Sequence, residues 1–219
     1  AAIGELAGMV GHDLRNPLTG INNAVYYLNK KRKCTDDDEK KMLEIINKAV
    51  EHANKIINSL LEYSREMHLD LTVCSPKLLL KDAFSLVHVP DNIKIVDRTI
   101  EEPAMRVDVD KMVRVFINLI KNAIDAMREG GTLEIRSSRK AQNIEFAFID
   151  SGKGIPDKLM PKIFTPLVTT KAQGMGFGLA ICKRIVEAHD GRIAFESVAG
   201  KGTTFTVALP IKPSLKSWR

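Results

Sequence analysis

The stretch IGELAGMVGHDLRNPLTGINNAVYYL, residues 3–28, has an apolar residue at every third or fourth position. These residues form a seam: Ile3, Ala7, Val10, Leu14, Pro17, Ile21, Ala24 and Leu28. Alternating spacings of four and three are the heptad pattern of helices that pack side by side. The pattern predicts a helix that runs to about Lys31 and buries one stripe against other helices.

A second stretch has the same periodicity and predicts a partner helix. Its seam consists of Met42, Ile46, Ala49, Ala53, Ile56, Leu60, Tyr63 and Met67. The polar segment 30–38 predicts a turn between the helices, with Thr35 as the N-cap of the second. Each helix would be roughly 45 Å long, and one thin hairpin cannot bury two such stripes. We therefore expect two hairpins to associate as a homodimeric four-helix bundle.

One histidine in the first stretch lies off the seam. His12 is five positions after the seam residue Ala7, which places it on the outer face of the helix. The acid Asp13 is next to it, and the amide of Asn16 follows one turn later. An exposed imidazole with these neighbours is available for chemistry, whereas a buried one is explained by packing. For Asn16 alone, a polar helix surface is the simpler interpretation.

Composition excludes several classes of protein. The net charge is +6, but 27 acidic residues are interleaved with the basic ones and only 5% of residues are aromatic, so we expect no binding to nucleic acid. Cys34, Cys74 and Cys182 are widely scattered, which disfavours a zinc site or a disulfide framework. No apolar run approaches about 18 residues. We expect a cytoplasmic segment without membrane contact, with any membrane span or sensor domain upstream of it.

The pattern changes after residue 68 to mixed strands and helices. Helices are predicted at 75–87, 109–127 and 176–188, and strands at 93–100, 132–138, 144–149, 192–198 and 203–209. Ser75 and Pro76 are a typical cap and first-turn proline. The fold class is therefore α+β multidomain, with a helical hairpin at 1–68, a linker at 69–75 and a second domain at 76–219 built from one mixed sheet with helices on one face.

Several motifs of the second domain suggest a nucleotide pocket. Asn118 and Asn122 lie one turn apart on one helix face, where their amide oxygens suit Mg²⁺. Asp150 ends a strand, and its carboxylate can accept the exocyclic amine of adenine. Gly152 and Gly154 after it would let the backbone approach the ring.

The remaining motifs lie closer to the C-terminus. The segment 163–171 contains a proline and is suited to a mobile lid, and Gly174, Gly176 and Gly178 open a helix whose N-terminus favours phosphate. Thr203 lies in a glycine-containing turn between the last strands. The glycine run follows a loop and not a strand, which argues against a dinucleotide-binding Rossmann site. Each motif alone is more often an ordinary turn or a solvated surface, so their joint order carries the argument.

Taken together, these motifs make the chain resemble the catalytic core of a sensor histidine kinase of two-component signalling. Residues 12–18 resemble the phosphoacceptor box, 118–122 the N box, 150–154 and 174–179 the two glycine boxes, and 164–171 the F box and lid. The resemblance implies a dimerisation and phosphotransfer bundle, followed by an α/β sandwich ATP-binding domain of the type shared by gyrase, heat-shock chaperones, histidine kinases and the mismatch-repair protein MutL. It also implies that ATP phosphorylates His12 and that a response regulator receives the phosphoryl group.

The resemblance also implies roles for single residues. Asp13 would hold the proton on the second imidazole nitrogen of His12, although family members more often carry glutamate there. Asn16 would orient a water that dephosphorylates the regulator. Asn118 stands where related ATPases have a glutamate that activates water, and an amide cannot take up that proton. ATP should therefore survive until it meets His12.

The expected nucleotide contacts follow from the same resemblance. Asn122 is the expected Mg²⁺ ligand, with Asn118 supporting it. Lys171 is the expected replacement for a family lysine near the phosphates, because Asp125 stands at that position. Asp150 would bind adenine, and the other expected contacts are Gly152, Gly154, Ile155, Phe164, Gly174, Gly176, Gly178, Leu179 and Thr203. Two alternatives to a kinase stay open at this point: an ATP-driven clamp and a scaffold that binds ATP without transferring it.

Overall fold

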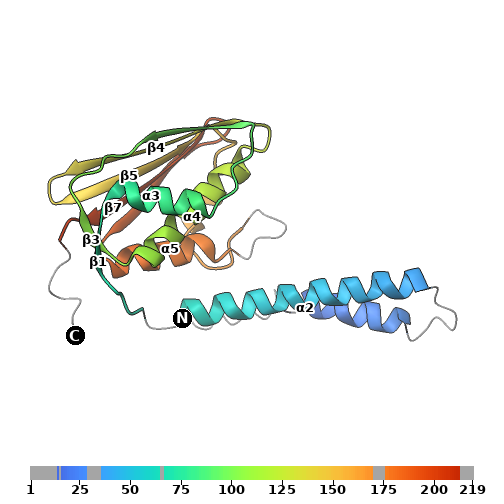
Figure 1. Cartoon of the computed structure of the whole chain (residues 1–219). Helices are drawn as coiled ribbons and strands as arrows, with labels where there is room; N and C mark the ends of the chain where they lie inside the picture. Colours follow the sequence, from blue (N-terminus) through green and yellow to red (C-terminus); the bar gives the residue numbers. More distant parts are fainter. Residues whose placement is uncertain (1–13, 15, 29–35, 65–66, 170–175, 213–219) are drawn as a thin grey trace. The chain divides into compact units, whose positions relative to one another are not determined.

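The structure is a computed structural model that describes residues 14, 16–28, 36–64, 67–169 and 176–212. The chain divides into two compact units (Figure 1). One comprises Ala1–Arg65 with Pro166–Phe177, and the other comprises Glu66–Thr165 with Gly178–Arg219. In the part of the chain that the structure describes, no helix combines the length and the apolar character that crossing a membrane requires.

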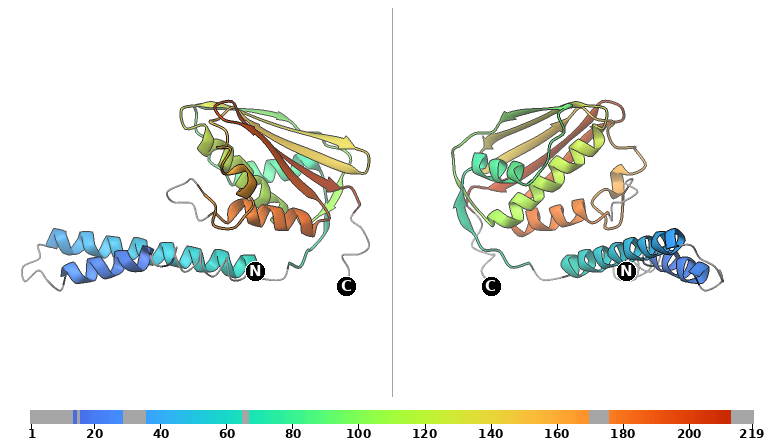
Figure 2. Two further views of the ribbon diagram at one scale, coloured as in Figure 1. Left: turned by 180° about the vertical axis from the view of Figure 1, so that it is seen from behind. Right: turned by 45° about the vertical axis from the view of Figure 1, so that its right-hand side comes forward.

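The first unit contains a helical hairpin. Residues 16–28 form a helix that runs beside α2 (Asp36–Ser64), as both Figure 1 and Figure 2 show. The two helices approach closely at Gly20, where an added Cβ would lie 3.9 Å from the Cβ of Ala49. Seam residues within these helices are half-buried or buried, with Pro17, Ala24 and Ile56 the most enclosed. The heptad prediction is therefore confirmed for the described residues, while Thr35 lies outside them.

Each helix also has a second apolar stripe, which sequence reasoning missed. We call it the outer stripe; it consists of Leu18, Val25, Leu43, Val50, Ile57 and Leu61. Each of these side chains is between 42% and 54% exposed. Leu18 and Val25 are seven residues apart, as are Leu43 and Val50, so the outer stripe follows the same heptad repeat as the seam. A single hairpin leaves this apolar surface in contact with water.

The second unit is built on a five-stranded mixed sheet. The strands are β2 (Ile93–Arg98), β4 (Gly131–Lys140), β5 (Asn143–Asp150), β6 (Arg192–Val198) and β7 (Gly202–Pro210), in the order β2-β4-β5-β7-β6. The pair β2 and β4 is parallel and the other pairs are antiparallel. The helices α3 (Pro76–Ser85), α4 (Val109–Ala126) and α5 (Gly178–Ala188) cover one face (Figure 2). A mixed sheet with helices on one face was predicted and is confirmed.

A second, two-stranded sheet was not predicted. In it β1 (Thr72–Cys74) pairs antiparallel with β3 (Met105–Val107). Each strand has three residues, too few for a periodic pattern to stand out in the sequence. A short 3₁₀-helix, η1 (Met160–Lys162), follows β5.

Ser75 caps α3 as predicted, because its Oγ accepts a hydrogen bond from the amide of Leu78 at 3.2 Å and Pro76 fills the first turn.

Aromatic packing between α4 and β5 forms the centre of the core. The ring of Phe116 meets those of Phe146 and Phe148 edge-on, with centroids 4.8 and 5.0 Å apart. Each buried phenylalanine contributes about 1.5–3 kcal/mol of hydrophobic stabilisation. Side chains alternate along a strand, so the register that buries Phe146 and Phe148 also buries Asp150 on the helix-covered face. Core packing therefore positions the carboxylate that the sequence singled out.

Candidate functional site

The proposed acceptor residues lie at the start of the first unit. His12 and Asp13 are outside the described residues, and their expected roles stay predictions. Asn16 is in the helix of residues 16–28 with an exposed side chain. An amide at this position is accessible to a partner in solution.

The two asparagines of α4, Asn118 and Asn122, are half-buried. Asn118 donates a hydrogen bond from Nδ2 to the carbonyl of Arg114 at 3.0 Å. A Cβ added to Gly178 would lie 3.0 Å from Oδ1 of Asn118, so this oxygen faces the first residue of α5. Asn122 lies one turn further along α4. The structure thus brings an amide oxygen next to a helix N-terminus, where anions are stabilised.

Asp150 is a buried carboxylate at the end of β5, with 6% of its surface exposed. Its Oδ1 accepts hydrogen bonds from the amides of Gly152 at 2.9 Å and Thr203 at 3.2 Å. Burial raises the pKa of this carboxyl above its ordinary value, and the two amide hydrogen bonds only partly offset that effect. A carboxylate can accept about four hydrogen bonds, so Asp150 retains capacity for a ligand donor such as an exocyclic amine.

The glycines after Asp150 allow close contact between backbone segments. A Cβ at Gly152 would lie 2.7 Å from the Cβ of Ala126 in α4. Gly154 has a φ of +68°, and a Cβ there would lie 2.3 Å from the carbonyl oxygen of Val198. These residues have to be glycine because the loop packs against α4 and the β6–β7 turn. Their expected contact with an adenine ring remains a prediction.

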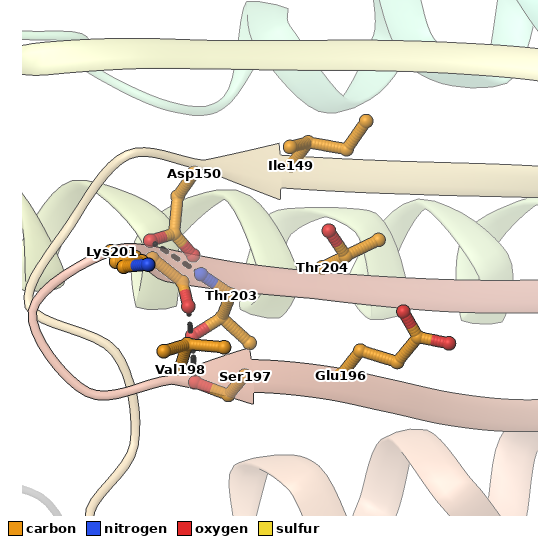
Figure 3. A pocket seen from close by; sticks show the side chains of 9 residues that line it. Ile149, Asp150, Glu196, Ser197, Val198, Lys201, Thr203 and Thr204 are labelled. Atoms are coloured by element: carbon orange, nitrogen blue, oxygen red, sulfur yellow. Dashed lines mark hydrogen bonds between the residues drawn. The ribbon is translucent and has the colours of Figure 1, made fainter.

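A hydroxyl network joins this loop to the β6–β7 turn. Ser197 Oγ accepts a hydrogen bond from the amide of Ile155 at 2.8 Å and donates to the carbonyl of Gly202 at 3.1 Å. It also lies 3.0 Å from Oγ1 of Thr203. Figure 3 shows Asp150, Ser197 and Thr203 together, where β5 and β6 end and β7 begins. These residues line a hollow of about 230 Å³. Sequence reasoning found Asp150, Ile155 and Thr203 but missed Ser197.

The other residues that were predicted to contact the nucleotide lie in several different segments of the chain. The ring of Phe164 packs edge-on against Phe195, with centroids 5.9 Å apart, and Nζ of Lys183 lies 5.9 Å from the Phe164 ring centroid. Leu179 is half-buried in the first turn of α5. In the first unit, Gly176 has a φ of +67°, a conformation that favours glycine. Lys171 and Gly174 are outside the described residues.

A buried histidine links α4 to α5, and nothing in the sequence pattern indicated it. His189 is 3% exposed; its Nε2 accepts a hydrogen bond from the amide of Asp108 at 2.9 Å, and its Nδ1 lies 2.7 Å from the carbonyl of Ile185. Nδ1 must therefore carry the proton of a neutral ring. Burial lowers the pKa of His189 below its ordinary value.

Asp108 in turn caps α4 and holds the segment before β1. Its Oδ1 accepts from the amide of Lys111 and its Oδ2 from the amide of Asp70, both at 3.0 Å. Burial alone would raise the pKa of this carboxyl, but hydrogen bonds from the Lys111 ammonium and from both amides outweigh burial and lower the pKa. The cluster therefore ties three segments of the second unit together.

Family comparisons cover both parts of the chain. Residues 2–68 match the family described as "His Kinase A (phospho-acceptor) domain". Residues 107–213 match the family described as "Histidine kinase-, DNA gyrase B-, and HSP90-like ATPase". The second match contains Asn118, Asn122, Asp150 and Thr203, the residues described above.

Individual relatives agree with these families. The sensor histidine kinase ZraS of Escherichia coli (strain K12) is 33% identical over 219 residues, which cover 98% of this chain and 47% of ZraS. The chain thus spans about half the length of the curated relatives it matches. The catalytic domain of histidine kinase ThkA is similar with a TM-score of 0.60 and 33% identity, over 66% of this chain and 97% of that domain. ThkA in complex with the response regulator protein TrrA aligns with a TM-score of 0.76 and 30% identity, over 95% of this chain and 62% of ThkA.

Proposed function

Because the chain belongs to the sensor histidine kinases of two-component systems, we propose that it transfers the γ-phosphoryl group of ATP to His12 and then to an aspartate of a response regulator. The observation that carries this proposal is the buried Asp150, held by the amides of Gly152 and Thr203, in a chain whose first 68 residues match a phosphoacceptor family. The complex of the relative ThkA with TrrA supports a response regulator as the partner.

Nucleotide binding is assigned to the second unit. Asp150 accepts a hydrogen bond from the adenine amine, with Ile155, Leu179 and Phe164 as apolar contacts. Asn122 offers an amide oxygen to Mg²⁺, a hard cation that prefers oxygen ligands and arrives with phosphates. Asn118, whose oxygen faces Gly178, supports Asn122 where the phosphates of the nucleotide bind. The expected roles of Lys171, Gly174 and Gly176 in the lid and the second glycine box stay predictions.

Asn118 favours phosphoryl transfer over hydrolysis. An amide has no proton-accepting role at neutral pH, and Nδ2 of this residue already donates to the carbonyl of Arg114. The site therefore lacks, at this position, a base that would activate water. This supports a kinase and disfavours an ATP-driven clamp.

His12 is the acceptor in the proposed reaction. Its unprotonated nitrogen attacks the γ-phosphorus, an N–P bond forms, and the P–O bond to ADP breaks with its electrons going to ADP. Asp13 holds the proton on the second nitrogen and so stabilises the charge that develops on the ring. In the next step the aspartate of the regulator takes the phosphoryl group, and His12 is regenerated.

The proposed active form is a homodimer in the cytoplasm, where ATP and the regulator are available. The outer stripe supports the dimer, because Leu43, Val50 and Ile57 repeat every seven residues and stay exposed in a single chain. A second hairpin placed on this stripe completes a four-helix bundle. Asn16 adds a phosphatase activity toward the regulator, since its exposed amide can orient a water.

Incubation with γ-labelled ATP and Mg²⁺ tests the proposal. We expect a label on the protein that is acid-labile and base-stable, as an N–P bond requires, and that is absent from a His12→Ala variant. Steady phosphate release without labelling indicates a clamp ATPase and contradicts the proposal. Nucleotide binding with neither labelling nor phosphate release indicates a scaffold and contradicts it as well.

A further inference from the structure

We propose that Ser197 fixes the hydroxyl of Thr203 as a hydrogen-bond acceptor, and that it thereby selects a 6-amino purine over a 6-oxo purine. The inference rests on the proposed function, because it assumes that the base of a nucleotide lies beside Asp150. It concerns Ser197, a residue at the end of β6 that none of the expected nucleotide contacts included.

The hydrogen-bond inventory of Ser197 leaves one arrangement. Its hydroxyl has one hydrogen and two lone pairs, and it has three partners within 3.1 Å: the amide of Ile155, the carbonyl of Gly202 and the hydroxyl of Thr203. The amide can only donate and the carbonyl can only accept. All three hydrogen bonds form together only if Ser197 donates to Gly202 and accepts from both Ile155 and Thr203.

In this arrangement the Thr203 hydroxyl donates its only hydrogen to Oγ of Ser197. Oγ1 of Thr203 then offers lone pairs and no donor to any further partner. Thr203 is 5% exposed as a residue, so water does not compete freely for the hydroxyl hydrogen. Thr203 is also paired with Asp150 across β5 and β7, and its amide donates to Asp150 Oδ1 at 3.2 Å.

Asp150 and Thr203 are paired across β5 and β7, so a purine that lies beside both residues meets two hydrogen-bond acceptors. Adenine has an amine with two hydrogens at C6, whereas hypoxanthine has a carbonyl oxygen there. The carboxylate of Asp150 and the acceptor-only hydroxyl of Thr203 can both accept hydrogen bonds from the amine of adenine. The carbonyl oxygen of hypoxanthine would face two acceptors, and no hydrogen would be available for a hydrogen bond between them. If the Thr203 hydroxyl were free to rotate, it could donate to that oxygen and selectivity would fall.

Ser197 also has a structural role that has to be separated from selectivity. It connects the loop after Asp150, through Ile155, to the turn at Gly202, so its removal leaves buried polar groups without a partner. A role confined to folding would lower the melting temperature and weaken all nucleotides alike. The ratio of affinities for two purines does not respond to such a uniform effect.

The test compares the binding of ADP and inosine diphosphate, each with Mg²⁺, to the purified chain. We expect Ser197→Ala to reduce the ADP preference about tenfold, which corresponds to about 1.4 kcal/mol. Ser197→Thr keeps the hydroxyl on a strand that tolerates β-branching, and it should restore the preference. Ser138→Ala removes an exposed serine from β4 and is the matched control, for which we expect no change.

A double-mutant cycle with Thr203→Val adds a second readout. Since both residues act through one hydrogen bond, Ser197→Ala should not reduce the preference further once Thr203 is valine. Equal weakening of both nucleotides by Ser197→Ala, with an unchanged ratio, overturns the inference and leaves the proposed function intact. A wild-type chain that binds no ADP overturns both.

Discussion

The charge of Asp150 opposes folding, and in the proposed function it serves nucleotide binding. Burial raises its pKa, so the ionised carboxylate is less favourable in the folded chain than in the unfolded one. A group with a raised folded pKa contributes stability below its unfolded pKa, and this contribution is lost as the pH rises through the folded value. At neutral pH the ionised carboxylate therefore costs stability, and a ligand donor compensates for that cost.

Asp150→Asn should separate these two effects. The amide oxygen can still accept from the amides of Gly152 and Thr203, so we expect a melting temperature without nucleotide at least as high as that of the wild type. ADP affinity should fall about 10- to 100-fold, because a charge-assisted hydrogen bond to the base is lost. Scanning fluorimetry and titration calorimetry measure the two quantities. An ADP affinity within a factor of about two of the wild type contradicts the role of Asp150.

Asn16→Ala should affect one activity and spare another. The side chain is exposed, so we expect the fold and labelling of His12 by ATP to be retained. Dephosphorylation of the phosphorylated regulator should fall at least about tenfold, since the amide that orients water is removed. Asn47→Ala, at an exposed position of α2, is the control. Full regulator dephosphorylation by the Asn16 variant refutes the assignment.

The ends of two helices meet at the pair His189 and Asp108. His189 is the first residue after α5, and Asp108 caps α4 and accepts a hydrogen bond from the amide of Asp70. The charged groups that act on the imidazole are Asp108, Lys111 and Asp190. Burial outweighs them and lowers the pKa of His189, so the unfolded chain binds a proton there more readily than the folded one.

Stability should therefore fall as the pH drops below about 6.5, the ordinary pKa of histidine, until the folded pKa is reached. Each group of this kind changes the free energy of unfolding by at most about 1.4 kcal/mol per pH unit. Urea unfolding at pH 7.5 and 5.5 measures the change. In His189→Gln the loss on acidification should be smaller, because the other four histidines are common to both chains. An identical pH dependence in both chains contradicts the role of His189.

The proposed homodimer depends on the outer stripe. Val50 and Ile57 are each 42% exposed in the single chain and lie seven residues apart on α2. Full burial of an apolar side chain of this size contributes about 1.5–3 kcal/mol, and covering the part that is still exposed contributes less than half of that for each residue.

Val50→Glu combined with Ile57→Glu should shift the chain from dimer to monomer. Two buried carboxylates per helix without partners would oppose association. Light scattering after size-exclusion chromatography measures the mass in solution. Lys55→Glu changes an exposed polar position of the same helix and should leave the dimer unchanged. A double variant that keeps the mass of two chains argues against the stripe as the interface.

The sequence by itself determined the elements and the family. The seam of α2, the cap at Ser75 and the alternation in β5 are local patterns, because they depend on residues a few positions apart. The motifs around Asn118 and Asp150 are also local, and the family that they indicated is the one to which the chain belongs.

Only the tertiary structure decided which residues that are distant in the sequence contact one another. The amide of Asp108 reaches His189 across 81 positions, and the amide of Ile155 reaches Ser197 across 42. The short strand β3 likewise forms because it pairs with β1. Such contacts depend on how strands pair and how helices cover the sheet, and no periodicity records them. Local patterns determine where elements begin and end, whereas long-range pairing determines which side chains share hydrogen bonds.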